Sequence, residues 1–288
     1  MTLIDGKALS AKIKEEVRVE VEELKSKEGI TPGLAVVLVG DDAASATYVN
    51  SKHKACEAAG IYSVVHTRPS STTQEELLAL IDEMNKDEKL DGILVQLPLP
   101  KHIDTTTVLE AINPLKDVDG FHPYNVGRMV SNLDAFLPAT PFGVMRMFEE
   151  HNIELSGKNC VVIGSSDIVG KPMASLLTNA KATVTVCNSR TKDLSAHTKA
   201  ADIVIIAVGV PHLLKGDMLK DGAVVIDVGI NRLDTGKLTG DADFEDCKDK
   251  CSFITPVPGG VGPMTIGMLL KNTLKAAKLR DKREGTNA

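Results

Sequence analysis

Short apolar segments alternate with helical patterns in the first part of the chain. The residues 33–40 (GLAVVLVG) are almost all apolar, which is typical of a strand buried on both faces of a sheet. The predicted elements are, in order, strand 33–40, helix 45–59, strand 61–67, helix 73–85 and strand 91–97. This βαβαβ order predicts a parallel sheet with right-handed crossovers.

The alternation stops in a stretch rich in Gly and Pro from 113 to 141, which is predicted as loop, and then resumes. The second series of predicted elements is helix 141–151, strand 158–164, helix 169–179, strands 183–187, 201–209 and 223–229, and helix 265–278. We therefore expect two α/β domains with parallel sheets, the second a Rossmann-like dinucleotide-binding domain. The expected bounds are 1–140 and 141–265, with a C-terminal helix 266–288 that packs back on the first domain.

The composition narrows the class of protein. The chain has 288 residues, of which 43% are hydrophobic and only 3% aromatic, so aliphatic side chains should fill two cores. The net charge of −6 gives no support for binding to nucleic acid. No apolar run reaches the roughly 18 residues of a membrane helix. The N-terminus lacks the pattern of a signal peptide, so we expect a cytoplasmic location without a membrane partner.

Five cysteines stand at irregular spacing, which argues against a disulfide framework. Cys247 and Cys251 are four residues apart, but no second pair of ligands stands near them in the sequence. We expect buried, inert thiols and no metal site.

A dinucleotide site is indicated by the loop that follows the predicted strand 158–164. Gly164 ends the strand, Ser165 and Ser166 follow, and Gly170 opens the next helix. Such a loop can present backbone amides and a helix N-terminus to a pyrophosphate. The two glycines are separated by five residues and the G-x-G-x-x-G spacing is missing, so an ordinary strand-to-helix turn is an equal interpretation of these residues alone.

The end of the next predicted strand bears on the choice of cofactor. An NAD enzyme should carry a carboxylate there, about 20 residues beyond the loop. This chain instead has Ser189 and Arg190, a hydroxyl and a guanidinium that suit the 2′-phosphate of NADP. The alternative is that Arg190 is a solvated loop residue.

A second constellation lies in the first predicted domain. Tyr48 and Lys52 are four residues apart on the predicted helix 45–59 and therefore project from the same face. A lysine in a cleft can have a lowered pKa and transfer protons, although the pair alone is more typical of a solvated helix face. Gln96 ends a strand and Asp119 follows in a loop, so Tyr48, Gln96 and Asp119 should share one cleft at the carboxyl edge of the sheet.

The run 258–263 (PGGVGP) is too rich in glycine for a helix or strand, and its bare backbone could approach a flat ligand. The Y-x-x-x-K spacing of Tyr48 and Lys52 also occurs in short-chain dehydrogenases. In those enzymes the cofactor loop precedes the Tyr/Lys pair, whereas here it follows the pair by more than 100 residues.

At this point the chain resembles the bifunctional methylenetetrahydrofolate dehydrogenase/methenyltetrahydrofolate cyclohydrolase family. The matching stretches are 45–54 (S-x-x-Y-V-x-x-K-x-K), 91–100 (DGILVQLPLP), 116–121 (KDVDGF), 164–172, 227–231 (DVGIN) and 256–265 (PVPGGVGPMT). They span almost the whole chain in the family's order.

The resemblance implies a role for each matching residue. Lys52 would transfer the proton of the hydrolytic step, and Gln96 would tune its charge state. Tyr48 would stack on the folate, and Asp119 would hydrogen-bond the pterin edge. The residues implied to bind NADP are Gly164, Ser165, Ser166, Ser189 and Ile230, to which the residue chemistry adds Arg190. The other residues that we expect to bind substrate are Leu97, Pro258, Gly259 and Gly260. Many members carry Arg at the position of Ser165 and His at that of Asn188.

The activity implied by the resemblance is oxidation of 5,10-methylenetetrahydrofolate with NADP, followed by hydrolysis of the 5,10-methenyl product to 10-formyltetrahydrofolate. These are steps of one-carbon metabolism that supply purine biosynthesis, and the family resemblance also implies a homodimer. Three alternatives stay open: a monofunctional methylenetetrahydrofolate dehydrogenase, a folate- or nucleotide-binding protein without activity, and an amino-acid dehydrogenase of the same two-domain plan.

Overall fold

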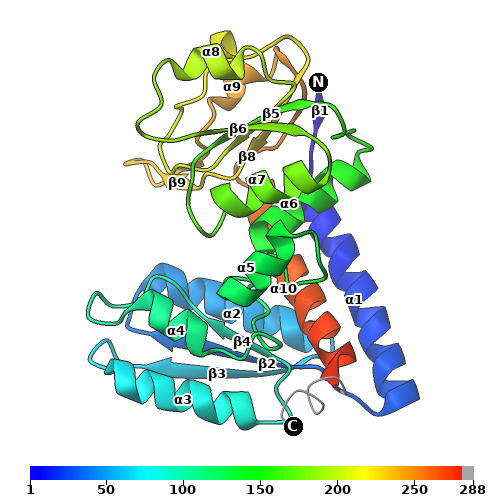
Figure 1. Ribbon diagram of the computed structural model, residues 1–288, viewed down its shortest axis with the longest axis vertical. Helices are drawn as coiled ribbons and strands as arrows, with labels where there is room; N and C mark the ends of the chain where they lie inside the picture. The colour runs from blue at the N-terminus through cyan, green and yellow to red at the C-terminus, as the bar shows by residue number, and fades with distance from the viewer. Residues whose placement is uncertain (281–288) are drawn as a thin grey trace. The chain divides into compact units, whose positions relative to one another are not determined.

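The computed structural model describes residues 1–280 and divides the chain into two compact α/β units (Figure 1). The three-stranded unit comprises 12–128, 134–137 and the chain from 266 onward, and the six-stranded unit comprises 1–11, 129–133 and 138–265. This grouping places residues 1–11 in the second unit rather than the first, because strand β1 (Thr2–Leu3) pairs with β11 (Cys251–Ile254). Of the predicted helix 266–288, residues 281–288 lie outside the described residues.

The sheet of the three-stranded unit is parallel, in the order β3-β2-β4. Its strands are β2 (Gly33–Val39), β3 (Tyr62–Arg68) and β4 (Gly92–Val95). Strand β2 is buried along its whole length, and its residues Ala35, Val37 and Val39 join one hydrophobic core. The alternation of a strand sends Leu34 and Val36 to the other face. Both faces of the sheet are therefore covered, as the continuous apolar run predicts.

Three capped helices of this unit follow the strands. They are α2 (Ala43–Ala58), α3 (Gln74–Lys86) and α4 (Thr105–Ala111), and their N-cap side chains are Asp42, Thr73 and Asp104. Each cap accepts a hydrogen bond from a backbone amide of the first turn, which fixes where the helix begins. Figure 1 shows α2 and α3 on opposite sides of the sheet.

Several helices stand where none was predicted, and α4 is one of them. Helix α1 (Gly6–Glu28) buries Leu9, Ile13, Val17 and Val21, whose spacing of four residues is a helical signal that the sequence analysis did not use. Helix α5 (Pro123–Val130) lies inside the stretch predicted as loop, so that prediction was wrong for these residues.

The C-terminal helix α10 (Val261–Lys278) begins four residues before its predicted start. Its residues from 266 onward belong to the three-stranded unit. There Asn272 donates hydrogen bonds to the carbonyls of Val118 and Leu137, at 2.8 and 2.9 Å. Beyond the helix, the Arg280 guanidinium donates to the fully buried carboxylate of Asp91. These polar contacts fix the end of the chain to this unit.

The six-stranded unit has a fully parallel sheet in the order β1-β11-β8-β7-β5-β6. Its remaining strands are β5 (Asn159–Ile163), β6 (Thr183–Cys187), β7 (Ile203–Ile206) and β8 (Ala223–Asp227). The strand order reverses beside β5, which is the usual place of a ligand crevice in such sheets. The prediction of two α/β units with parallel sheets is confirmed.

Helices cover both faces of this sheet (Figure 1). On one side lie α6 (Ala139–Glu150) and α7 (Gly170–Asn179), and on the other α8 (Leu194–Thr198) and α9 (Phe244–Cys247). A short 3-10 helix (Gly216–Met218) and an antiparallel pair, β9 (Asn231–Arg232) and β10 (Leu238–Thr239), complete the unit. Strands β1 and β11 were not predicted, because they are too short for a clear pattern.

Two findings bear on location and redox chemistry. Within residues 1–280, no helix is long and apolar enough to cross a membrane. All five cysteines are free and buried, and burial raises the pKa of Cys247 and Cys251 to about 12, so their thiols stay protonated. In the same described part of the chain, no group of three His, Cys, Asp or Glu side chains is placed to hold a metal ion.

Candidate active site

The side chain of Lys52 is buried in the three-stranded unit. It lies on the inner face of α2 with Ser45, Val49 and Cys56, and only 9% of its surface is exposed. Its Nζ donates a hydrogen bond of 3.0 Å to Oε1 of Gln96. The alternative interpretation, in which Lys52 lies on a solvated helix face, is therefore wrong.

Gln96 comes directly after β4, at the carboxyl edge of the sheet. Its backbone N–H donates a hydrogen bond of 2.8 Å to the carbonyl of Val37, which continues the hydrogen-bond ladder of the sheet by one residue. Its side-chain Nε2 donates to the carbonyl of Leu97 at 2.7 Å. This bond leaves Oε1 as the acceptor for Lys52, so the orientation of the carboxamide follows from its partners.

The loop 116–121 brings Asp119 to the same edge. Its Lys116 carbonyl accepts from the amide of Ile93 at 2.8 Å, so the loop runs beside β4. Val118 packs against Gly92, where a Cβ would lie 2.8 Å from both methyl groups of the valine. The glycine of DGILV is therefore needed to seat the loop that carries Asp119.

Burial sets the charges of the site. Burial lowers the pKa of Lys52, and the negative charge of Asp119 opposes that shift. Asp119 keeps partial exposure, but the protein around its carboxyl raises its pKa to about 6, with Lys52 acting in the opposite direction. The mutual attraction of Lys52 and Asp119 thus offsets part of the cost of burying two charges.

Tyr48 is far more exposed than Lys52, which lies four residues further along α2. Half of its surface, 50%, is exposed, whereas Lys52 is buried. The two residues lie one turn apart on α2, with Tyr48 at the solvent side of the face that buries Lys52. Leu97 is half-buried beside Gln96. The three-stranded unit thus brings together Tyr48, Lys52, Gln96, Leu97 and Asp119 from three segments of sequence.

In the six-stranded unit, close backbone contacts explain both glycines of the predicted dinucleotide loop. Gly164 has a φ of 121°, and a Cβ there would lie 2.4 Å from the carbonyl oxygen of Ala207. A Cβ at Gly170 would lie 2.1 Å from the carbonyl oxygen of Gly164. Larger residues would push the loop away from β7 or helix α7 away from the loop.

The loop itself leaves amides available for an anion. The hydroxyl of Ser166 accepts from the amides of Val169 and Gly170, at 3.2 and 3.4 Å, and so caps α7 from within the loop. Within residues 1–280, the amides of 165–168 have no hydrogen-bond acceptor. Free amides beside a helix N-terminus suit a phosphate group.

The predicted residues after β6 lie on an exposed turn. The side chain of Asn188 accepts from the amide of Arg190 at 2.9 Å, and its carbonyl accepts from the amide of Thr191. Ser189 and Arg190 are both exposed. Strands β5 and β6 are parallel neighbours, so this turn stands at the same edge of the sheet as Gly164.

The remaining predicted residues also belong to the six-stranded unit. Ile230 is 46% exposed in the loop after β8. Gly259 has a φ of 106°, and its carbonyl accepts from the amide of Lys7. A Cβ at Gly6 would lie 1.8 Å from the carbonyl oxygen of Gly260. The turn that follows Pro258 can thus approach the N-terminal segment closely, because both Gly6 and Gly260 lack a side chain.

Comparison with known proteins identifies both parts of the chain. A family model described as the tetrahydrofolate dehydrogenase/cyclohydrolase catalytic domain matches residues 4–119, and one described as the NAD(P)-binding domain of the same enzymes matches residues 138–281. The chain belongs to the tetrahydrofolate dehydrogenase/cyclohydrolase family. The resemblance inferred from the sequence is confirmed, with Lys52, Gln96 and Asp119 inside the catalytic domain and Gly164, Ser189 and their neighbours inside the NAD(P)-binding domain.

Relatives match over nearly their whole length. The bifunctional protein FolD of Aliarcobacter butzleri is 81% identical over 99% of both chains, and that of Nautilia profundicola is 64% identical over 96% of this chain and 98% of its own. The crystal structure of FolD from Campylobacter jejuni matches with a TM-score of 0.96 and 59% identity, covering 97% of this chain and 99% of its own. The enzyme of Trypanosoma brucei, solved with NADP and an inhibitor, matches with 0.93 and 40%, covering 98% and 99%.

Sequence reasoning missed the residues that hold the site loops of this family member. Asp117 is buried and accepts from the amides of Gly120, Phe121 and His122 and from Nδ2 of Asn125. It stands in the KDVDGF stretch, and an aspartate three residues before a glycine is a recognisable turn signal. Its position two residues before Asp119 makes it the organiser of that loop.

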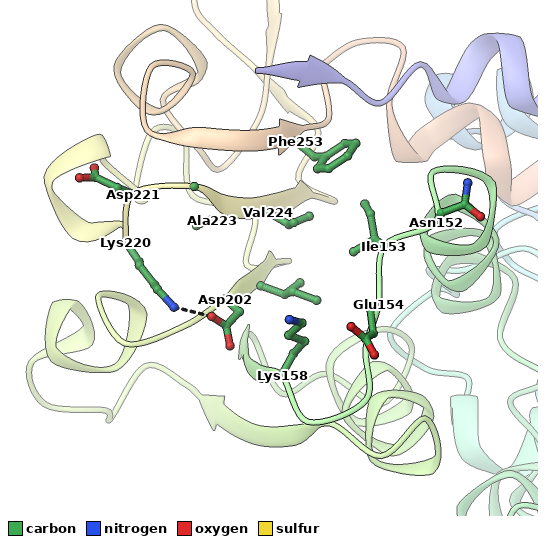
Figure 2. Close-up of a pocket in the computed structure, with 12 residues that line it drawn as sticks. Asn152, Ile153, Glu154, Lys158, Asp202, Lys220, Asp221, Ala223, Val224 and Phe253 are labelled. Atoms are coloured by element: carbon green, nitrogen blue, oxygen red, sulfur yellow. Dashed lines mark hydrogen bonds and ion pairs between the residues drawn. The ribbon is translucent and has the colours of Figure 1, made fainter.

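A pocket of about 350 Å³ opens at the other edge of the six-stranded sheet (Figure 2). Its lining includes Lys158, Asp202 and Ala223, which stand at the amino ends of β5, β7 and β8. Lys220 donates to Asp202 at 2.5 Å there. None of the predicted site residues lines this pocket, and Gly164 and Ser189 stand at the opposite edge of the same sheet.

The charge on Asp119 should destabilise the folded protein at neutral pH. Its carboxyl binds a proton more tightly in the folded protein, with a pKa of about 6, than at its ordinary value of 3.8. Above about pH 6 the ionised group therefore costs roughly 1–3 kcal/mol of folding free energy. Asp119→Asn removes the cost, so the variant should be more stable than the parent at about pH 7.5.

Urea denaturation between about pH 4 and pH 8 measures this effect. The gain of Asp119→Asn should shrink as the pH falls through about 6, because the parent carboxyl is then already neutral. Asp82→Asn, which changes an exposed carboxylate on α3, is the control and should show no gain. A variant that is less stable than the parent at neutral pH would contradict the assigned burial of Asp119.

Proposed function

We propose that this chain oxidises 5,10-methylenetetrahydrofolate to the 5,10-methenyl form with NADP and then hydrolyses that product to 10-formyltetrahydrofolate. The observation that carries the proposal is the buried Lys52 amine, bonded to Gln96 and attracted by Asp119, in the family's catalytic domain. Its relatives are named bifunctional. A monofunctional dehydrogenase would have no use for this buried amine.

Lys52 is suited to the proton transfers of the hydrolytic step. Water attacks the methenyl cation, and the adduct must lose one proton from oxygen and gain one on the leaving nitrogen before the ring opens. Burial lowers the pKa of Lys52, which makes its neutral amine available as a base nearer to neutral pH. The ammonium formed by the first transfer then supplies the proton for the second. As the C–N bond breaks and the formyl C=O forms, the remaining hydroxyl proton is released to water.

Gln96 and Asp119 adjust this amine in different ways. Gln96 accepts a hydrogen bond from Nζ at 3.0 Å and fixes the position of the amine without adding a charge. Asp119 favours the charged form of Lys52 and limits how far burial lowers its pKa. Burial and Asp119 thus act on the pKa of Lys52 in opposite directions, with the lowering by burial the larger effect.

Substrate binding uses the same edge of the sheet. The Asp119 carboxylate accepts hydrogen bonds from the amino-pyrimidinone edge of the pterin, and the exposed ring of Tyr48 stacks on the aromatic portion of the folate. Leu97 offers an apolar contact beside Gln96. The contact of Pro258, Gly259 and Gly260 with folate stays a prediction from their bare backbone.

The residues around Gly164 fit a dinucleotide. The close approach at Gly164 and the free amides of 165–168 provide a place for the phosphates, and Ser165 and Ser166 flank it. NADP, when bound, accepts the hydride from the methylene carbon. Ile230, which is exposed in the loop after β8, completes this site.

Arg190 and Ser189 hold the 2′-phosphate in this proposal. Both are exposed on a turn whose backbone is fixed by Asn188, and Arg can bond a phosphate with two parallel N–H groups. In this chain Ser165 and Asn188 stand where many members carry Arg and His, so the recognition of the phosphate depends more heavily on Arg190. The homodimeric state and the cytoplasmic location also stay predictions.

Arg190→Ala should raise the KM for NADP about tenfold or more, because a hydrogen bond to a charged group is lost. The KM for NAD should change little, since NAD lacks the 2′-phosphate. Initial rates of NADPH and NADH formation with methylenetetrahydrofolate measure both values. Lys192→Ala, an exposed cation two residues further on, is the control and should leave both values near the parent's. Equal losses with both cofactors would refute the role of Arg190.

Lys52→Met keeps most of the length of the side chain and removes the amine. The cyclohydrolase rate should fall by at least about 100-fold, because general acid–base groups contribute about 10²–10⁴-fold. Hydride transfer needs no base, so the dehydrogenase should fall less. Absorbance should show methenyltetrahydrofolate accumulating in the variant and not in the parent.

Lys54→Met is the matched control, because Lys54 is exposed on the same helix two residues away. It should clear the methenyl intermediate at the parent's rate. If Lys52→Met also clears it at that rate, Lys52 is not the proton-transfer residue and the proposed mechanism fails.

A further inference from the structure

Two buried aspartates lie at the edge of the six-stranded sheet that carries Gly164. Asp227 ends β8 and is 4% exposed, and Asp241 follows β10 and is fully buried. Within residues 1–280, neither has a lysine or arginine partner, and both instead accept hydrogen bonds from N–H groups of loops. Buried carboxylates that bond only neutral donors are costly, and this cost calls for an explanation.

Asp227 holds the backbone on which Asp241 stands. Its Oδ1 accepts from the amides of Gly229 and Asp241, at 2.9 and 3.0 Å, and its Oδ2 accepts from the amide of Ala242 at 2.8 Å. A Cβ at Gly240 would lie 1.8 Å from Oδ2 of Asp227. The carboxylate therefore fits its place only because residue 240 is glycine.

Asp241 in turn joins two loops that leave neighbouring strands. Its Oδ2 accepts from the amides of Val208 and Gly209, at 2.7 and 3.0 Å, in the loop after β7. Its Oδ1 accepts from Nδ2 of Asn231 at 2.8 Å, in the loop after β8. A Cβ at Gly229 would lie 2.2 Å from this carboxylate, so the second loop also approaches it closely.

Both loops border the proposed cofactor site. The first begins at Ala207, whose carbonyl oxygen lies where a side chain at Gly164 would be, and the same side chain would contact Val208 at 3.5 Å. The second carries Ile230 between two tied residues, because the amide of Gly229 bonds Asp227 and the side chain of Asn231 bonds Asp241. The carboxylate pair thus sets the position of the backbone on both sides of Ile230.

We propose that Asp241 is a positioning residue for the dinucleotide, which fixes the loops 207–209 and 229–231 against Gly164 before the cofactor binds. The proposal rests on the proposed use of this edge by NADP. Loops that are fixed beforehand lose little freedom on binding, so the affinity for the cofactor is higher. Asp241 itself touches loop N–H groups, and it acts on the dinucleotide through them.

The substitution Asp241→Asn isolates this role, because it keeps the size of the side chain. A carboxylate can accept at both oxygens, whereas a carboxamide accepts at one and donates at the other. Asn at 241 can accept from Val208 and Gly209 only through a neutral oxygen, and it keeps the contact with Asn231 only if the carboxamide of Asn231 turns over to accept. Both loops are therefore held less tightly, because hydrogen bonds to an ionised acceptor are stronger than those to a neutral one.

Calorimetry of NADP binding to the purified full-length protein tests the proposal. Asp241→Asn should raise the Kd for NADP about tenfold or more, while thermal unfolding followed by circular dichroism reports whether the six-stranded unit of the variant is folded. Asp202→Asn is the matched control (Figure 2), because Asp202 accepts from the amide of Asn159 at 2.9 Å and from Lys220 at the opposite edge of the same sheet. The control should keep its Kd within about twofold of the parent's even where its melting temperature falls.

An unchanged Kd in a folded Asp241→Asn variant would overturn the proposal. If that variant does not fold, Asn231→Ala decides, since it removes one half-buried partner of Asp241 and leaves the other bonds in place. A Kd raised about threefold or more supports the proposal, and an unchanged Kd overturns it. A parent protein that does not bind NADP at all would instead refute the proposed function from which this inference starts.

Discussion

The site in the three-stranded unit depends on one interaction, the burial of the Lys52 amine against Gln96. The charge of Asp119 acts on the same amine. A buried lysine is costly unless partners replace the water that it loses. Here each partner comes from a different segment: Lys52 from α2, Gln96 from the end of β4, and Asp119 from a loop that Gly92 admits beside the same strand. The parallel sheet supplies the common edge at which these segments meet.

The six-stranded unit uses buried charge differently. Asp227 and Asp241 accept hydrogen bonds from loop N–H groups, and burial raises the pKa of Asp227 to about 6. Asp117 does the same for the loop of Asp119 in the other unit. In these three places a buried carboxylate fixes loop backbone by accepting hydrogen bonds from its N–H groups. In the loop of Asp119, the carboxylate that fixes the backbone and the carboxylate that we propose for substrate binding lie two residues apart.

The sequence predicted the parts of the fold that depend on continuous apolar runs. Strands such as 33–40 and 223–229 stand where the pattern places them, because strands buried on both faces need apolar residues throughout. Helix α5 and strands β1 and β11 were missed, since short elements are specified by tertiary contacts rather than by period. For the site, the four-residue spacing of Tyr48 and Lys52 could not tell a buried face from a solvated one. The roles of Asp117 and Asp241 were likewise hidden, because their partners are backbone groups that only the fold brings near.

The protonation of Lys52 in the intact protein is the most direct test of this account. Nuclear magnetic resonance of the protein with isotope-labelled lysine follows each amine as the pH changes, and the resonance lost in Lys52→Met identifies the one of interest. The account predicts that Lys52 titrates below the ordinary lysine range, because burial lowers its pKa, and that Asp119→Asn moves this titration to a still lower pH. A Lys52 that titrates together with the exposed lysines, and that does not respond to the loss of Asp119, would contradict the central claim.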